Sequence, residues 1–162
     1  MKSLGDIMYD SINHILCKLI HANKYITSVT ELSIEEIDKL IEYYGIKGVI
    51  LDIDETLRFD MGDIPIENIE WLDMLKTKLK VIVLSNGMDK NIRSLLEEKG
   101  IVYLSMALKP LKRNFIKACN ILELNPNEVV VIGDDIISDI YGGNRCNMTT
   151  IKVNSDKVLK KK

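Results

Sequence analysis

The chain has 162 residues, 46% of them hydrophobic and 28% charged, and 22 Lys and Arg against 24 Asp and Glu give a formal net charge of -2. This length fits one folded domain, and the composition excludes a disordered or collagen-like chain. The near-neutral charge argues against nucleic acid as a partner, and three scattered cysteines without a CxxC pair argue against a disulfide framework or a zinc site.

The first segment of the chain predicts an amphipathic helix. Apolar residues recur at helical spacing between Leu4 and Ile20, and Ser3 and Asp6 are suited to cap the first turn. We expect this apolar stripe to cover one face of a sheet or to contact a partner subunit in a homodimer. Contact with a membrane surface is the alternative.

The location of the protein follows from two further features of the sequence. No apolar run approaches the roughly 18 residues that a membrane span needs. The first residues, MKSLGD, also lack the charged and then apolar layout of a signal peptide. We therefore expect a cytoplasmic protein, and the amphipathic helix leaves peripheral membrane contact open.

Five short apolar runs then predict buried strands, and helical patterns separate them. The runs are rich in Val and Ile and lack polar alternation, as a parallel sheet covered on both faces requires. This alternation predicts right-handed βαβ units, and therefore an α/β fold with a three-layer, doubly wound, mostly parallel sheet. The strands are expected at residues 48–53, 81–85, 101–105, 129–133 and 149–153, and the helices at 33–44, 66–79, 90–99, 111–122 and 136–141.

Two acidic residues stand where the first of these strands ends. Asp52 and Asp54 lie two residues apart in the segment DIDET. In open α/β sheets, ligands bind at the carboxyl ends of the strands, so we expect both carboxylates to face a ligand there. Taken alone, the segment could equally be a polar turn after a strand.

Polar residues also follow the later runs. Ser85 ends the second run, and Lys109 precedes Pro110, where the proline would take the first position of the helix 111–122 and leave the lysine at its entrance. The fourth run ends at Asp134, and Asp139 follows about a turn and a half later.

This set of side chains suits reaction with a phosphate monoester. The phosphate is dianionic and repels a carboxylate nucleophile, so attack needs a divalent cation bound by acids and a lysine on the phosphoryl oxygens. Mg²⁺ prefers such oxygen ligands.

The order of these motifs resembles the haloacid dehalogenase (HAD) superfamily of phosphohydrolases. The resemblance implies a Rossmannoid core and a Mg²⁺-dependent phosphomonoester hydrolase that acts through an aspartyl-phosphate intermediate on a phosphorylated substrate. The matching segments are DIDET at 52–56, VIVLSN at 81–86, ALKP at 107–110 and GDDIISD at 133–139.

The resemblance also implies a role for each matching residue. Asp52 would be the nucleophile, and Asp54 would be the general acid that protonates the leaving group and then activates water. Asp134 would bind Mg²⁺ together with Asp52 and the main-chain carbonyl of Asp54, and Asp139 would orient a metal-bound water or Lys109. Phosphate binding is implied for Thr56, Ser85, Asn86 and Lys109, a supporting role for Asp135, and substrate contact for Arg58, Asn144 and Arg145.

From about Tyr25 onward, the chain more closely resembles the YqeG-type subgroup of HAD subfamily IIIA. The segments GIKG at 45–48 and GGNR at 142–145 carry this resemblance. The subgroup includes phosphatidylglycerophosphate phosphatases. Glu55 stands where the subgroup usually has Asn, and Asn147 stands where it usually has Gly.

The spacing of the motifs also bears on the substrate. Only residues 58–65 separate the first motif from the next expected helix, which leaves no room for the cap domain that many HAD enzymes insert there. An open, capless site suits a bulky substrate such as phosphatidylglycerophosphate, and a protein or small-molecule phosphomonoester is the alternative. The single domain would comprise an N-terminal helix at 1–24, a catalytic core at 46–153 and a basic tail at 154–162.

Two other classes of protein fit part of the pattern. A receiver-like phosphoacceptor also uses an acidic pair, a hydroxyl and a lysine, but its acceptor aspartate ends the third strand. Here the third run ends in Ser105 and Met106. An interaction protein that kept the fold and lost the activity is the second alternative.

Overall fold

The computed structural model describes residues 3–154, without the side chains of Asn13 and Cys17. Most of the basic tail predicted at 154–162 therefore lies outside the described residues. Within the described part of the chain, no helix combines the length and apolar character needed to cross a bilayer.

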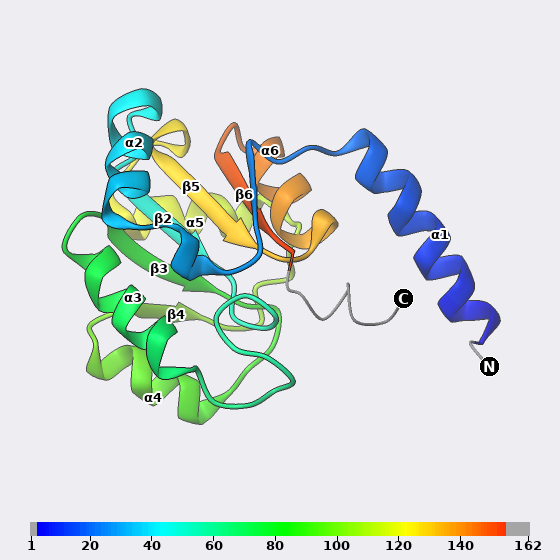
Figure 1. Ribbon diagram of the computed structural model, residues 1–162, viewed down its shortest axis with the longest axis horizontal. Coiled ribbons are helices and arrows are strands. Elements are labelled where there is room, and N and C mark those ends of the chain that lie inside the picture. Colours follow the sequence, from blue (N-terminus) through cyan, green and yellow to red (C-terminus); the bar gives the residue numbers. More distant parts are fainter. Residues whose placement is uncertain (1–2, 155–162) are drawn as a thin grey trace.

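A six-stranded sheet forms the centre of the molecule, and every neighbouring pair of its strands is parallel (Figure 1). The strand order is β1-β6-β5-β2-β3-β4, so β2 and β5 are central neighbours although they are far apart in the sequence. The predicted α/β class with a doubly wound sheet is confirmed. The strands are β1 (Lys24–Ile26), β2 (Gly48–Leu51), β3 (Lys80–Leu84), β4 (Val102–Leu104), β5 (Val129–Gly133) and β6 (Thr149–Val153).

The sheet has one strand more than the five that the sequence predicts. The additional strand, β1, is three residues long and pairs with β6 at the edge of the sheet. Only Ile26 of this strand is buried. Such a short segment forms no apolar run, because one buried side chain suffices at an edge.

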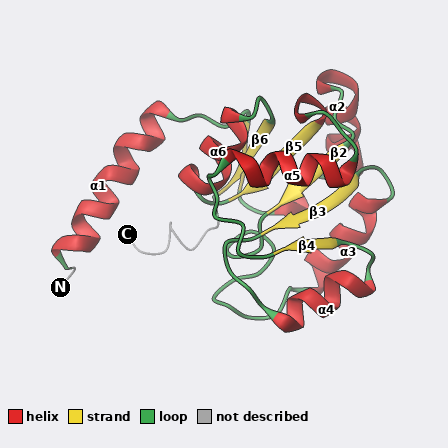
Figure 2. Cartoon of the chain, turned by 180° about the vertical axis from the view of Figure 1, so that it is seen from behind, coloured by secondary structure: helices red, strands yellow, loops and turns green. Residues whose placement is uncertain are grey.

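Helices cover both faces of the sheet, which gives the predicted three layers. Side chains alternate along each strand, so Val49 and Leu51 belong to one hydrophobic cluster while Ile50 belongs to the other. The first cluster includes side chains of α2, α3 and α4, and the second includes those of α5, which crosses in front of the strands in Figure 2. The helices are α1 (Leu4–Leu19), α2 (Ile34–Tyr44), α3 (Ile66–Lys76), α4 (Lys90–Glu98), α5 (Lys112–Leu122) and α6 (Gly142–Arg145).

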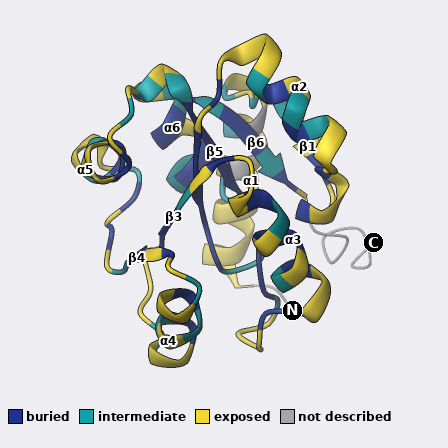
Figure 3. Cartoon of the chain, turned by 90° about the vertical axis from the view of Figure 1, so that its left-hand side faces the viewer, coloured by how far each residue is buried: buried dark blue, intermediate teal, exposed yellow. Residues whose placement is uncertain are grey.

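The N-terminal helix α1 forms where the sequence predicts it, but it does not cover the sheet. Ser3 and Asp6 make the expected capping box, with the Asp6 amide donating to Ser3 Oγ at 3.1 Å. The apolar side chains of α1 are nevertheless largely exposed, and the helix projects away from the body (Figure 1). The expectation of a sheet contact is wrong because the other helices already bury the strands of the sheet, as Figure 3 shows.

Three helix predictions differ from the structure, two at their ends and one in the type of helix. The helix predicted at 66–79 ends at Lys76, and the one predicted at 136–141 is a π-helical turn, Ile136–Tyr141, followed by the short α6. Helix α5 begins at Lys112, so Pro110 precedes the helix instead of opening it, and the Lys109–Pro110 bond is cis.

Candidate active site

The first acidic pair lies where β2 ends at the carboxyl edge of the sheet. The amide of Asp52 still donates to the carbonyl of Ile132 at 3.0 Å, so Asp52 is fixed beside β5. The chain then turns tightly, because the amides of Leu57 and Arg58 both donate to the carbonyl of Ile53, at 2.8 and 3.1 Å. This turn keeps Asp54 at the same edge of the sheet, where it lines a cavity together with Asp52.

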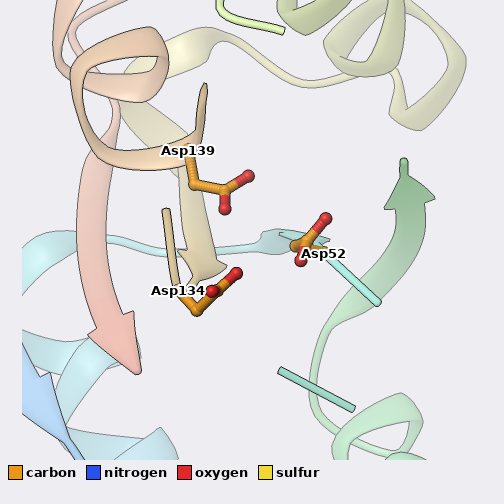
Figure 4. Close-up of side chains that lie close together, drawn as sticks. All are labelled: Asp52, Asp134 and Asp139. Atoms are coloured by element: carbon orange, nitrogen blue, oxygen red, sulfur yellow. The ribbon is translucent and has the colours of Figure 1, made fainter. Parts of the chain in front are cut away.

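Three carboxylates converge at this edge (Figure 4). The parallel pairing of β2 with β5 brings Asp52 next to Asp134, which follows directly after β5. Asp139 comes from the π-helical turn, and one carboxylate oxygen from each of the three residues lies within 4.8 Å of the others. Oxygen ligands at this spacing suit a divalent cation.

Gly133 makes the close approach of Asp139 possible. A Cβ atom at position 133 would collide with the Asp139 carboxylate, so a side chain here would displace it. Asp135 caps the turn that carries Asp139, accepting from the amides of Ile137 at 2.9 Å and Ser138 at 2.6 Å. The predicted supporting residue Asp135 thus lies beside the cluster and shapes the turn.

Lys109 lies between two of the carboxylates. Its Nζ atom is 2.6 Å from Asp52 Oδ1 and 2.6 Å from Asp139 Oδ1, and all three side chains are buried. We call Asp52, Lys109 and Asp139 the inner triad. Burial alone would lower the pKa of Lys109, but the carboxylates of Asp139 and Asp52 outweigh it and raise this pKa, so the ammonium stays charged.

The third carboxylate, Asp134, makes none of the described ion pairs. Burial, and after it the nearby carboxylates of Asp52, Asp139 and Asp135, together raise the pKa of Asp134 to about 8. A single ammonium faces these acids, so the cluster has an excess of negative charge. A divalent cation would offset this excess, and the residues present therefore fit a metal ion.

Ser85 and Asn86 extend the site from the end of β3. Ser85 Oγ accepts from the amide of Gly87 at 3.2 Å. The Asn86 carboxamide holds the main chain of Lys109, accepting from its amide at 2.6 Å and donating to its carbonyl at 3.3 Å. Asn86 therefore positions the lysine loop, a role that the sequence does not reveal.

These side chains surround a cavity of about 210 Å³ at the carboxyl edge of the sheet. A larger depression, of about 590 Å³, lies at the opposite edge, where Lys80 Nζ donates to the carbonyl of Leu122 at the end of α5. Lysines at that edge bond the carbonyls at helix ends or pair with single carboxylates, whereas the smaller cavity gathers several acidic residues. The smaller cavity is lined by Asp52, Asp54, Glu55, Ser85, Asn86, Gly87, Asp134, Asp135, Ser138 and Asp139.

Three of the predicted site residues, Lys109, Thr56 and Arg58, are buried and do not line the cavity. Thr56 is buried, and its hydroxyl donates to Asp52 Oδ2 at 3.3 Å. Arg58 is also buried, with Nε 2.8 Å from Asp54 Oδ1 and Nη1 2.7 Å from Asp89 Oδ2. We call Asp54, Arg58 and Asp89 the outer triad. A polar residue before helix 90–99 is a recognisable cap, but nothing in the sequence links Asp89 to Arg58.

Two other residues with an expected substrate contact lie away from the cavity. Asn144 donates from Nδ2 to the carbonyl of His21 at 2.9 Å and accepts from Thr150 Oγ1 at 2.9 Å. The exposed Arg145 guanidinium lies over the ring of Tyr141, 5.3 Å from its centroid. In the structure Asn144 therefore joins the segment after α1 to β6, and Arg145 contacts its neighbour Tyr141.

Comparisons with known proteins agree with this fold. A family model described as HAD-hydrolase-like matches residues 107–161. The chain is 35% identical over 111 residues to the probable phosphatase YqeG of Bacillus subtilis (strain 168), covering 67% of this chain and 64% of that protein. The chain thus spans less than two thirds of the length of this relative.

Two solved structures share the fold. A HAD family enzyme from Bacteroides thetaiotaomicron, in complex with magnesium and inorganic phosphate, superimposes with a TM-score of 0.58 at 16% identity, over 68% of this chain and 95% of that one. The cobalt-bound deoxy-D-mannose-octulosonate 8-phosphate phosphatase (YrbI) from Haemophilus influenzae gives a TM-score of 0.51 at 18% identity, over 72% and 74% of the two chains.

The parallel sheet and its acidic carboxyl edge, together with these matches, support the assignment of this chain to the HAD superfamily. The similarity to the Bacillus subtilis protein supports the YqeG type within this superfamily.

Proposed function

We propose that the protein is a Mg²⁺-dependent phosphomonoester hydrolase that forms an aspartyl-phosphate on Asp52. The convergence of Asp52, Asp134 and Asp139 beside the buried Lys109 carries this proposal. The naming of the Bacillus subtilis relative as a probable phosphatase supports it, as does the magnesium and phosphate complex of the Bacteroides thetaiotaomicron enzyme.

The metal would be held by the carboxylates of Asp52 and Asp134 and by the main-chain carbonyl of Asp54. When bound, Mg²⁺ offsets negative charge on the cluster and on the phosphoryl oxygens. Asp139 lies close to these ligands but is bonded to Lys109, so its part is to hold the lysine in place. Lys109 and Ser85 would bind phosphoryl oxygens.

In the first step, a carboxylate oxygen of Asp52 attacks phosphorus and forms a new P–O bond. The bond from phosphorus to the leaving oxygen breaks, and this oxygen takes a proton from the carboxyl group of Asp54. In the second step, Asp54 takes a proton from a water molecule whose oxygen attacks phosphorus. The bond from phosphorus to Asp52 then breaks, which releases phosphate and restores the carboxylate.

The surroundings of the cavity favour a bulky, amphiphilic substrate. Met61, Met88, Met106 and Leu108 are exposed on the loops that follow β2, β3 and β4, all at the carboxyl edge. These apolar side chains would contact the body of a substrate whose phosphate enters an open, capless site. Phosphatidylglycerophosphate has this chemistry, whereas a protein or small-molecule phosphomonoester would make less use of an apolar border.

The activity is tested with p-nitrophenyl phosphate and with a phosphomonoester panel that includes phosphatidylglycerophosphate in mixed micelles. We expect Mg²⁺-dependent turnover that chelator abolishes and that Asp52→Asn lowers by about 10³-fold or more. A preference for the lipid would support the amphiphilic substrate. Turnover that persists in Asp52→Asn, with the same chelator response as the wild type, would overturn the mechanism.

A further inference from the structure

Arg58 is buried at the back of the cavity, where its guanidinium joins two carboxylates from different loops. Its side chain is 4% exposed, with Nε on Asp54 Oδ1 at 2.8 Å and Nη1 on Asp89 Oδ2 at 2.7 Å. A guanidinium is planar and presents its donors in fixed directions. Its position therefore determines where the carboxylate of Asp54 lies.

Asp89 anchors this arrangement to the body of the fold. Its Oδ1 atom accepts from the amides of Asn91 at 2.9 Å and Ile92 at 3.1 Å, at the start of α4. Its own amide donates to the hydroxyl of Tyr103, on β4, at 3.3 Å. One carboxylate oxygen of Asp89 thus holds the helix while the other holds Arg58, so the guanidinium is fixed to the scaffold.

Asp54 needs such a support because it is the exposed member of the outer triad. Its side chain is 42% exposed, and on a tight turn it would rotate between several orientations. Arg58 occupies Oδ1, whereas Oδ2 lies toward Gly87, which lines the cavity. The ion pair therefore selects which oxygen faces the space where a leaving group would be.

We propose that Arg58, held by Asp89, is a positioning residue that orients Asp54 for proton transfer to the leaving group. This inference rests on the proposed function, in which the leaving oxygen takes the Asp54 proton as its bond to phosphorus breaks. Arg58 does not line the cavity, so it acts through Asp54. This positioning role takes the place of the substrate contact that the sequence predicts for Arg58. An ion pair that merely ties two loops together is the alternative.

Varying the leaving group distinguishes a role of Arg58 in orienting Asp54 from a role in joining two loops. A poor leaving group needs the proton and a good one does not, so loss of orientation at Asp54 harms the two substrates unequally. Phenyl phosphate and 2,4-dinitrophenyl phosphate have similar shapes and differ strongly in this respect. We compare kcat/KM, which covers the steps up to formation of the phosphoenzyme and leaves out its hydrolysis.

We expect Arg58→Gln to lower kcat/KM about 10- to 100-fold for phenyl phosphate and less than about threefold for 2,4-dinitrophenyl phosphate. Arg58→Lys should recover part of the loss because it keeps the charge. In an Asp54→Asn background, Arg58→Gln should add less than about a twofold effect, since both changes remove the same interaction. Arg113→Gln, at an exposed position of α5, is the matched control and should leave both values unchanged.

Equal losses of kcat/KM on both substrates would overturn the inference and favour an ion pair that only joins the two loops. Wild-type values of kcat/KM on both substrates would overturn the inference as well. Should Arg58→Gln fail to fold, Asp89→Asn carries the test, because it keeps the shape of the anchor and should lower only the phenyl phosphate value, by about three- to tenfold. Absence of Asp52-dependent turnover in the wild type would instead count against the proposed function itself.

Discussion

The carboxyl edge of the sheet holds two triads with the same arrangement of charge, a cation between two aspartates, but their surroundings differ. The inner triad is buried and built on Lys109, whereas the outer triad is built on Arg58 and leaves Asp54 partly exposed. A nucleophile benefits from a fixed, dry position, and a proton donor must reach both a leaving group and water. The difference in burial therefore matches the difference between the two proposed tasks.

The largest expected difference between the triads is in stability. Lys109→Met removes the cation from two buried carboxylates, and we expect it to lower the free energy of unfolding by about 3–5 kcal/mol. Arg58→Gln should cost about 1–2 kcal/mol, because water reaches both of its partners. Urea denaturation without metal measures both, and losses of equal size would contradict the contrast in burial.

The second difference is in the dependence of stability on pH. In metal-free protein, the pKa of Asp134 is about 8 in the folded state against 3.8 unfolded, so the folded state binds more protons between these values. Stability should then fall as pH rises from about 4 to about 8, by up to about 1.4 kcal/mol per pH unit. Mg²⁺ should raise the melting temperature more at pH 8 than at pH 6, where protons compete with it.

The outer triad should respond to pH in the opposite direction. The Arg58 hydrogen bond holds the pKa of Asp89 below its ordinary value, so its contribution is present at neutral pH and is lost on acidification below about 4. Melting temperatures of Asp134→Asn and Asp89→Asn across pH separate the two responses. The first change should flatten the loss of stability between about pH 4 and pH 8, and the second should flatten the loss below about pH 4.

The smallest effect is expected outside both triads. Arg145 is exposed and stacks on Tyr141, so Arg145→Gln should change stability by less than about 0.5 kcal/mol and kcat/KM by less than about twofold. Steady-state kinetics on the preferred substrate check this. A tenfold rise in KM would show that the substrate extends as far as α6.

The meeting of Asp52, Ser85 and Asp134 at one edge could be predicted from the sequence, and the outer triad could not. Parallel strands bring their carboxyl ends to one edge, so motifs at the ends of β2, β3 and β5 predict that Asp52, Ser85 and Asp134 meet there. The pairing of Arg58 with Asp89 depends instead on the path of an irregular loop. No strand or helix period specifies such a path.

The contacts of elements at the edge of the fold could not be predicted from the sequence either. The pattern in residues 4–20 predicts an apolar helical face but not what it contacts, and in the described chain this face is exposed. Strand β1 has a single buried residue, too little for an apolar run. Both cases show that periodicity reports which side chains are apolar, whereas partners depend on the surfaces that the rest of the chain leaves uncovered.

The Asn86 side chain has a mechanical consequence. Its carboxamide forms hydrogen bonds with the amide and the carbonyl of Lys109, as a main-chain peptide group would. The Asn86 side chain thus extends the hydrogen bonding between β3 and β4 into the loop after β4. The hydroxyl of Ser85 and the ammonium of Lys109 are thereby mounted on one rigid body. A displacement of either of these proposed phosphate-binding groups would therefore carry the other with it.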